Sequence, residues 1–106
     1  MEYKLKPGLL ELMVGITLLK IDDAEGVGVK KGQNEERSKR KNLVKGIKAQ
    51  IVDDTIHIEL DITVSYEKNL IEVAEKVREE VASALKRITG LNVEEVNVNV
   101  VGVNAV

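Results

Sequence analysis

The fold is decided by residues 69 to 103, NLIEVAEKVREEVASALKRITGLNVEEVNVNVVGV. In its first two thirds, apolar residues recur at steps of three and four, which predicts one apolar stripe along a helix. This stripe consists of Leu70, Val73, Ala74, Val77, Val81, Leu85 and Ile88. Charged residues fill the positions between them, so the sequence predicts an amphipathic helix that packs on a core by one face.

Both ends of this helix carry the residues that helix ends favour. The Asn69 side chain can accept a hydrogen bond from a free backbone N–H of the first turn, and Glu72 follows at capping-box spacing. At the other end, Lys86 and Arg87 suit the negative end of the helix dipole, and Gly90 can adopt the left-handed stop. Alternating valines and asparagines from Val96 onward then predict a closing strand.

Upstream of the helix, residues 47 to 66 predict a β-hairpin. Ile47, Ala49 and Ile51 alternate with polar residues, and a longer alternation runs from Ile56 to Tyr66. Asp53-Asp54 forms the turn between the two predicted strands.

Residues 9 to 21 predict a first helix that has two apolar stripes. Leu9, Leu12, Met13, Ile16 and Leu19 form a broad stripe that we expect to face the core. Leu10, Val14 and Leu18 lie on roughly the opposite side, at steps of four. A helix in a two-layer domain buries one face, so this second stripe needs another cover. Either the following loop covers this second stripe, or the stripe is a surface for self-association or for a partner.

The predicted element order is a weak strand at residues 1 to 5, then helix, strand, strand, helix and strand. We therefore expect an α+β fold with two layers, in which two helices cover one face of a mixed three- or four-stranded sheet. The whole chain, residues 1 to 106, forms one domain by its length. Residues 22 to about 43, rich in glycine and charge, are expected to form a flexible basic loop.

Composition excludes several classes of site. The chain has no cysteine, which excludes disulfides and thiolate metal sites, and its two tyrosines are its only aromatic residues. No apolar run is long enough for a membrane span, and no signal peptide is visible, so a cytoplasmic location is expected.

A search for catalytic and metal-binding patterns predicts no active site, no cofactor and no metal centre. His57, Glu59 and Asp61 share the outward face of a strand and could touch a divalent cation. A solvated polar sheet face explains the same pattern more simply, because a second histidine is absent. The Gly26-Val27-Gly28 segment matches neither a P-loop nor a dinucleotide fingerprint.

Charge is distributed unevenly along the chain. Residues 30 to 48 contain eight basic and two acidic residues, whereas the net charge of the whole chain is −2. Anion or partner binding is therefore conceivable through a basic set made of Arg37, Lys39, Arg40, Lys41, Lys45 and Lys48. A solvated loop is the simpler interpretation. The lack of nearby aromatic residues and of a GxxG loop argues against nucleic acid.

The chain resembles the alkaline shock protein family, the Gls-type envelope stress response proteins of Gram-positive and related bacteria. The resemblance rests on KNLVKGIK at residues 41 to 48, on the hairpin, on Tyr66 and on the helix after it. Its most specific part is the ending TGLNVEEVNVNVVGV, residues 89 to 103.

The resemblance implies a small non-enzymatic cytoplasmic protein of cell-envelope homeostasis. Members of this family self-associate, and a separate anchor protein can hold them near the membrane. The family offers no accepted catalytic residues to carry over. We therefore expect an oligomeric scaffold that acts by protein contact, with a membrane-anchored protein as one partner and a peripheral position at the inner face of the membrane. A module that binds RNA or anionic lipid through residues 30 to 48 is the alternative.

Overall fold

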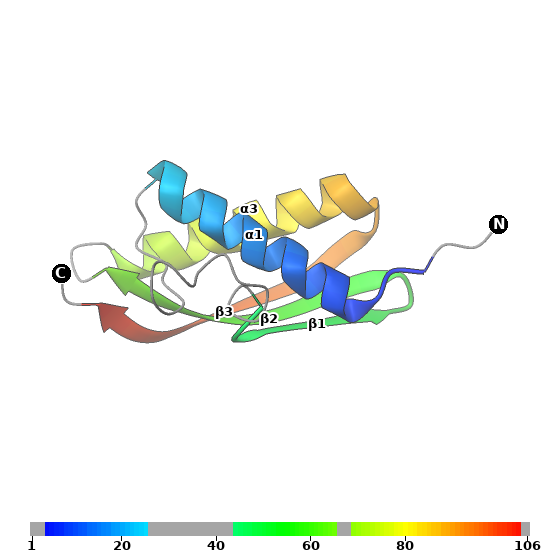
Figure 1. Ribbon diagram of the computed structural model, residues 1–106, viewed down its shortest axis with the longest axis horizontal. Helices are drawn as coiled ribbons and strands as arrows, with labels where there is room; N and C mark the ends of the chain where they lie inside the picture. Colours follow the sequence, from blue (N-terminus) through cyan, green and yellow to red (C-terminus); the bar gives the residue numbers. More distant parts are fainter. Residues whose placement is uncertain (1–3, 26–43, 66–68, 105–106) are drawn as a thin grey trace.

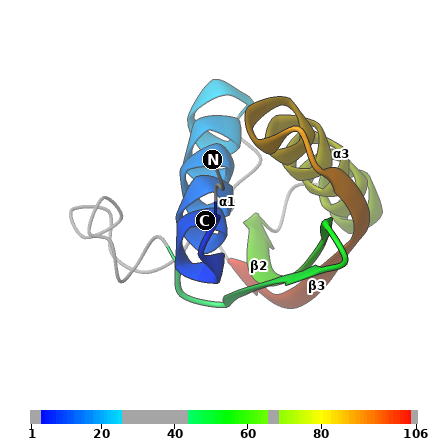
Figure 2. The ribbon, with the colours of Figure 1, turned by 90° about the vertical axis from the view of Figure 1, so that its right-hand side faces the viewer.

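The computed structural model describes residues 4–25, 44–65 and 69–104. Its elements are α1 (Pro7–Glu25), β1 (Ile47–Val52), β2 (Thr55–Ser65), α3 (Leu70–Thr89) and β3 (Asn92–Asn104). Both helices lie on the same face of the sheet, so the described part of the chain has two layers (Figure 1, Figure 2). The predicted α+β class is confirmed, and so is the order of the helices and strands from α1 onward.

The strand order in the sheet of the described residues is β1-β2-β3. β1 and β2 pair antiparallel as the predicted hairpin, and β2 and β3 pair parallel. A parallel pair needs a crossover connection, and α3 supplies it. The weak first strand predicted at residues 1 to 5 is not present at Lys4 and Leu5, which lie outside any strand, while residues 1 to 3 lie outside the described part.

The hairpin turn is formed by Asp53 and Asp54, whose φ angles are 51° and 62°. Two positive φ angles in a two-residue loop match the right-handed twist of the flanking strands. Aspartate tolerates this left-handed conformation better than most residues do, because its short side chain can bond to the local backbone.

The core lies between the helices and one face of the sheet. On β2, the central strand, every second side chain is buried there: Ile56, Ile58, Leu60, Ile62 and Val64. The residues between them point away from the helices and form a polar face, as the alternation predicts. Residues of β1 and β3 in register with the buried ones extend the core to both sides, from Ile47 to Val96.

Helix α3 begins and ends where the sequence predicts. Asn69 Oδ1 accepts a hydrogen bond of 3.1 Å from the backbone N–H of Glu72, and Gly90 ends the helix with a φ of 76°. The middle of the predicted stripe is buried, at Val73, Val77, Val81 and Leu85. Its two ends, Leu70 and Ile88, are exposed.

Helix α1 packs by the opposite face from the one predicted. Leu10, Val14 and Leu18 are 0%, 0% and 2% exposed and belong to the core, together with Ile21. Leu9 and Ile16, expected in the core, are exposed. Helix α1 contacts both β1 and α3. The face that it turns toward them runs from Leu10 to Ile21 and contains no charged residue, so this face is the buried one. The proposed self-association stripe of Leu10, Val14 and Leu18 is therefore part of the domain's own core.

Helix α1 also continues to Glu25, past its predicted end near Ile21. Of the predicted loop, residues 22 to 25 are therefore helical, and residues 26 to 43 lie outside the described part of the chain.

Candidate functional site: a groove between the two helices

A hollow lies between α1 and α3, on the side away from the sheet. It has a volume of about 580 Å³. Helix α1 contributes Met13, Ile16, Thr17, Lys20 and Ile21, and α3 contributes Glu80, Ser83, Ala84, Arg87 and Ile88. We call this hollow the helix groove.

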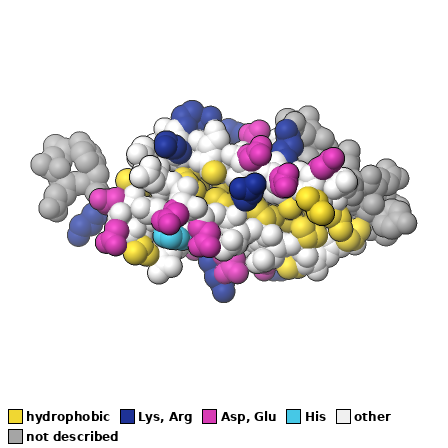
Figure 3. Space-filling model, turned by 180° about the vertical axis from the view of Figure 1, so that it is seen from behind, with side chains coloured by type: hydrophobic (Ala, Val, Ile, Leu, Met, Phe, Trp, Pro, Cys, Tyr) yellow, Lys and Arg dark blue, Asp and Glu magenta, His cyan; other side chains and the backbone are white. Residues whose placement is uncertain are grey.

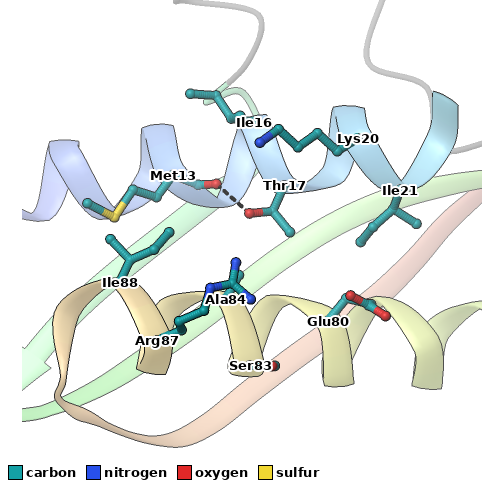
Figure 4. A pocket seen from close by; sticks show the side chains of 10 residues that line it. All are labelled: Met13, Ile16, Thr17, Lys20, Ile21, Glu80, Ser83, Ala84, Arg87 and Ile88. Atoms are coloured by element: carbon teal, nitrogen blue, oxygen red, sulfur yellow. Dashed lines mark hydrogen bonds between the residues drawn. The ribbon is translucent and has the colours of Figure 1, made fainter. Parts of the chain in front are cut away.

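Apolar side chains form one end of the helix groove. Met13 of α1 and Ile88 of α3 point toward one another there (Figure 4), and Ile16 of α1 also lines the groove. Ile16 is 40% exposed and Ile88 is 54% exposed, so water covers two large aliphatic side chains on neighbouring helices. Apolar side chains gathered in a groove and rimmed by polar ones are typical of a contact surface for another protein.

Charged and polar side chains border the rest of the groove. Lys20 and Arg87 supply two cations from opposite helices, and Glu80 supplies one carboxylate near Ile21 (Figure 4). The Thr17 hydroxyl is occupied, because Oγ1 donates a hydrogen bond of 2.8 Å to the carbonyl of Met13. The groove can therefore accommodate an apolar segment and can pair with a carboxylate at Lys20 or Arg87.

The outer face of the sheet carries the residues that we considered for a metal. His57 Nδ1 lies 3.6 Å from Glu95 Oε2 on the neighbouring strand. The side-chain amide of Asn99 donates to Glu59 Oε2 at 3.4 Å and to Asp61 Oδ1 at 3.0 Å. Across residues 4–25, 44–65 and 69–104 no group of three histidine, cysteine or acidic residues is placed to hold a metal ion. Cross-strand pairing with Glu95 and Asn99 thus accounts for this face.

Two of the six residues of the predicted basic set, Lys45 and Lys48, lie in the described part of the chain. Arg37, Lys39, Arg40 and Lys41 lie outside the described residues. Lys45 is exposed just before β1, and Lys48 is exposed on the outer face of β1, in register with Glu59 of β2. The structure brings Lys45 and Lys48 to the start of one strand.

The helix groove was missed from the sequence because its residues were assigned to other surfaces. Ile16 and Met13 were expected in the core, and so was Ile88. One signal was available: on a helical wheel Lys20 falls inside the broad stripe of α1, beside Leu9 and Ile16. A lysine in the middle of a stripe marks the solvent side of a helix.

None of the helices in the described ranges is both long and apolar enough to cross a membrane. The chain also matches no solved structure at a significant level.

The sequence is similar to two kinds of curated bacterial protein. It is 29% identical over 106 residues to the uncharacterized protein YqhY of Bacillus subtilis. This match covers 96% of the present chain and 76% of YqhY. The chain is 27% identical over 97 residues to a stress response regulator gls24 homolog of Streptococcus pyogenes serotype M3. That match covers 90% of this chain, which spans only 54% of the streptococcal protein.

A family model matches almost the entire chain. It is the model of the Asp23 family, described as having a cell envelope-related function, and it covers residues 1–105. The resemblance to Gls-type proteins noted from the sequence is confirmed by this match and by the gls24 relatives. The chain therefore belongs to the Asp23 family, a family with a function related to the cell envelope.

Proposed function

We propose that this protein is a non-enzymatic interaction protein of an envelope-related stress response. It associates with its own copies and contacts a partner protein at the cytoplasmic side of the cell envelope, where a membrane-anchored protein is the partner expected from the family resemblance. The helix groove is the surface that receives this partner.

One observation carries the proposal: Ile16 of α1 and Ile88 of α3 are both exposed and, with Met13, line one groove between the two helices. Leaving such side chains in water has a cost, since burying an isoleucine is worth roughly 1.5–3 kcal/mol. A partner that covers them gains this energy, and Lys20 and Arg87 select for a segment that carries carboxylates beside its apolar residues.

The family match and the names of the relatives support a role in an envelope-related stress response. The family is envelope-related, and the streptococcal relatives are called stress response regulator homologs. Binding of RNA or anionic lipid through residues 30 to 48 gains no comparable support, because the two described members of that basic set lie at one strand and Lys48 stands opposite an acidic residue.

Site-specific photo-crosslinking in cells tests the proposal. A photoreactive amino acid in place of Ile88 is expected to form an adduct with a discrete protein when the cells are under envelope stress, because this side chain lies at the mouth of the groove. Mass spectrometry identifies the adduct. Adding Ile16→Glu should reduce its yield by about tenfold, since a charge at the centre of an apolar contact costs on the order of 1–2 kcal/mol.

The control places the same photoreactive residue at Asp54, an exposed position in the hairpin turn on the sheet. Adducts at position 88 that are no more abundant than those at position 54, or that contain nucleic acid in place of protein, would contradict the proposal.

A further inference from the structure

The two edges of the sheet differ in how they are protected. β1 is short, six residues, and it carries Lys48. The Glu11 side chain of α1 reaches this edge, where its Oε2 accepts a hydrogen bond of 3.3 Å from the backbone N–H of Ala49. A lysine, a short strand and a covering helix are ordinary ways to keep an edge strand from pairing with another chain.

β3, at the other edge, is a long strand without a lysine, and within residues 4–25, 44–65 and 69–104 no helix bonds to its free side. It runs for 13 residues, and among the described strands it pairs with β2 alone. From Val96 to Val106 the sequence VNVNVVGVNAV contains no charged residue and no proline. A long uncharged edge strand rich in valine presents a row of backbone groups that another strand can pair with.

Apolar side chains accompany this open edge. Val100, Val101 and Val103 are 36%, 62% and 49% exposed, and Ile71 at the start of α3 is 72% exposed. In the view from behind, hydrophobic side chains form a band toward the end of the molecule where β3 ends (Figure 3). Val101 is the extra residue of a β-bulge, because Val100 pairs with Ile62 and Gly102 pairs with Thr63.

We infer that the free edge of β3 pairs antiparallel with β3 of a second copy, which joins two three-stranded sheets into one of six strands. This inference rests on the proposed function only in taking the protein to associate with its own copies. The inference places the contact between copies at β3 and not at α1.

The charges of β3 are compatible with a second copy as the occupant. The acidic residues of β3, Glu94 and Glu95, lie in its first half. Suppose that two copies of β3 pair antiparallel, with the two-fold axis between Val98 and Val101. Glu94 and Glu95 of one copy then lie opposite uncharged residues of the partner's β3, or past the end of that strand. Like charges directly opposite one another would destabilise the pair, and this register has none.

The flank of α3 beside β3 is also self-complementary. A shallow groove between them, about 430 Å³, is lined by Ile71, Ala74, Glu75 and Arg78 of α3 and by Val96 and Val98 of β3. A two-fold axis through this part of β3 brings α3 of the two copies alongside one another in opposite directions. Glu75 of one copy then lies near Arg78 of the partner subunit, and the exposed Ile71 side chains are covered.

The chain has no cysteine, so single cysteines introduced along the strand test the contact directly. Asn97→Cys, Asn99→Cys and Val101→Cys are each treated with a short bismaleimide, and Gln50→Cys on the protected β1 edge is the matched control. We expect a covalent dimer for the β3 positions, with a yield that peaks at one of them and marks the two-fold axis. Yields no higher than that of Gln50→Cys at every β3 position would overturn the inference.

Light scattering supplies the second measurement. The native chain is expected to be a dimer or larger, and Val101→Lys should raise its dissociation constant at least tenfold, while Val52→Lys on the β1 edge should leave it unchanged. Both positions are exposed, so circular dichroism should show a native fold for both variants. A native chain that is monomeric at every concentration would overturn the inference and leave the edge to an extended segment of another protein.

These outcomes are separable from those of the helix groove. If Val101→Lys is monomeric but still forms the adduct at position 88, the edge contact stands independently of the groove contact. If the edge cysteines do not cross-link while the adduct at position 88 persists, the edge inference alone fails.

Discussion

Leu18→Glu is expected to unfold the protein and not merely to separate its copies. Leu18 is 2% exposed and lies in the core with Val14 and Ile21. A carboxylate at this position must either remain charged in an apolar environment or be protonated, and both cost free energy. We expect a loss of about 4 kcal/mol or more, out of the roughly 5–15 kcal/mol that stabilise a typical domain. Urea unfolding followed by circular dichroism measures it.

Ile16→Glu is the matched control, because it replaces an aliphatic residue of the same size with glutamate two residues away on the same helix. Ile16 is 40% exposed, and we expect its free energy of unfolding to change by about 0.5 kcal/mol or less. If Leu18→Glu were as stable as Ile16→Glu, the face that α1 presents to the core would be assigned incorrectly.

Leu60→Ala is expected to have the next largest effect on stability. Leu60 is fully buried on the central strand and lies in register with Ile47 on one side and Val98 on the other. Removing its side chain leaves a cavity in the core, because the strands on both sides of β2 hold it in place. A loss of about 2–5 kcal/mol is typical of such a change. The urea midpoint should fall while the slope of the transition stays the same.

Val103→Ala provides the comparison for Leu60→Ala. Val103 pairs with Val64 near the end of β3 and is 49% exposed, so its truncation should cost less than about 1 kcal/mol. Equal losses for the two variants would contradict the placement of β2 at the centre of the sheet.

Several parts of the fold could be predicted because local signals agreed with one another. The start and end of α3 follow from Asn69 and Gly90, whose capping roles depend on short-range geometry alone. The hairpin follows from strict alternation on both sides of Asp53-Asp54. In these segments periodicity, capping and turn residues all favour one structure, which is the condition under which sequence patterns are most informative.

The orientation of α1 could not be predicted by counting apolar residues. Apolar side chains occur all around this helix, and the broader stripe, with Leu9 and Ile16, is the exposed one. What decides the buried face is the pair of surfaces that α1 packs on, β1 and α3, and these lie far away in the sequence. The error carried over to the candidate site, since the stripe proposed for self-association is core and the helix groove uses the other stripe.

The strand pairing also contains details that a simple alternation does not predict. Two bulges interrupt β3, at Glu94 and Val101, where two residues of the same kind follow one another. β3 lies at an edge because the strand order in the sheet is β1-β2-β3. The order of helices and strands along the sequence does not determine this strand order. The basic residues Arg37, Lys39, Arg40 and Lys41 stay a prediction, because they lie outside the described residues.

The most direct test of the central claim, that contacts made by the helix groove serve an envelope stress response, is growth of a deletion strain under envelope stress. The strain is complemented with the native gene, with the double variant Ile16→Glu, Ile88→Glu, or with Val52→Glu as an exposed control on β1. We predict that all three proteins accumulate to the same level, and that only the double variant fails to restore growth. A double variant that accumulates normally and restores growth as well as the native gene would contradict the account.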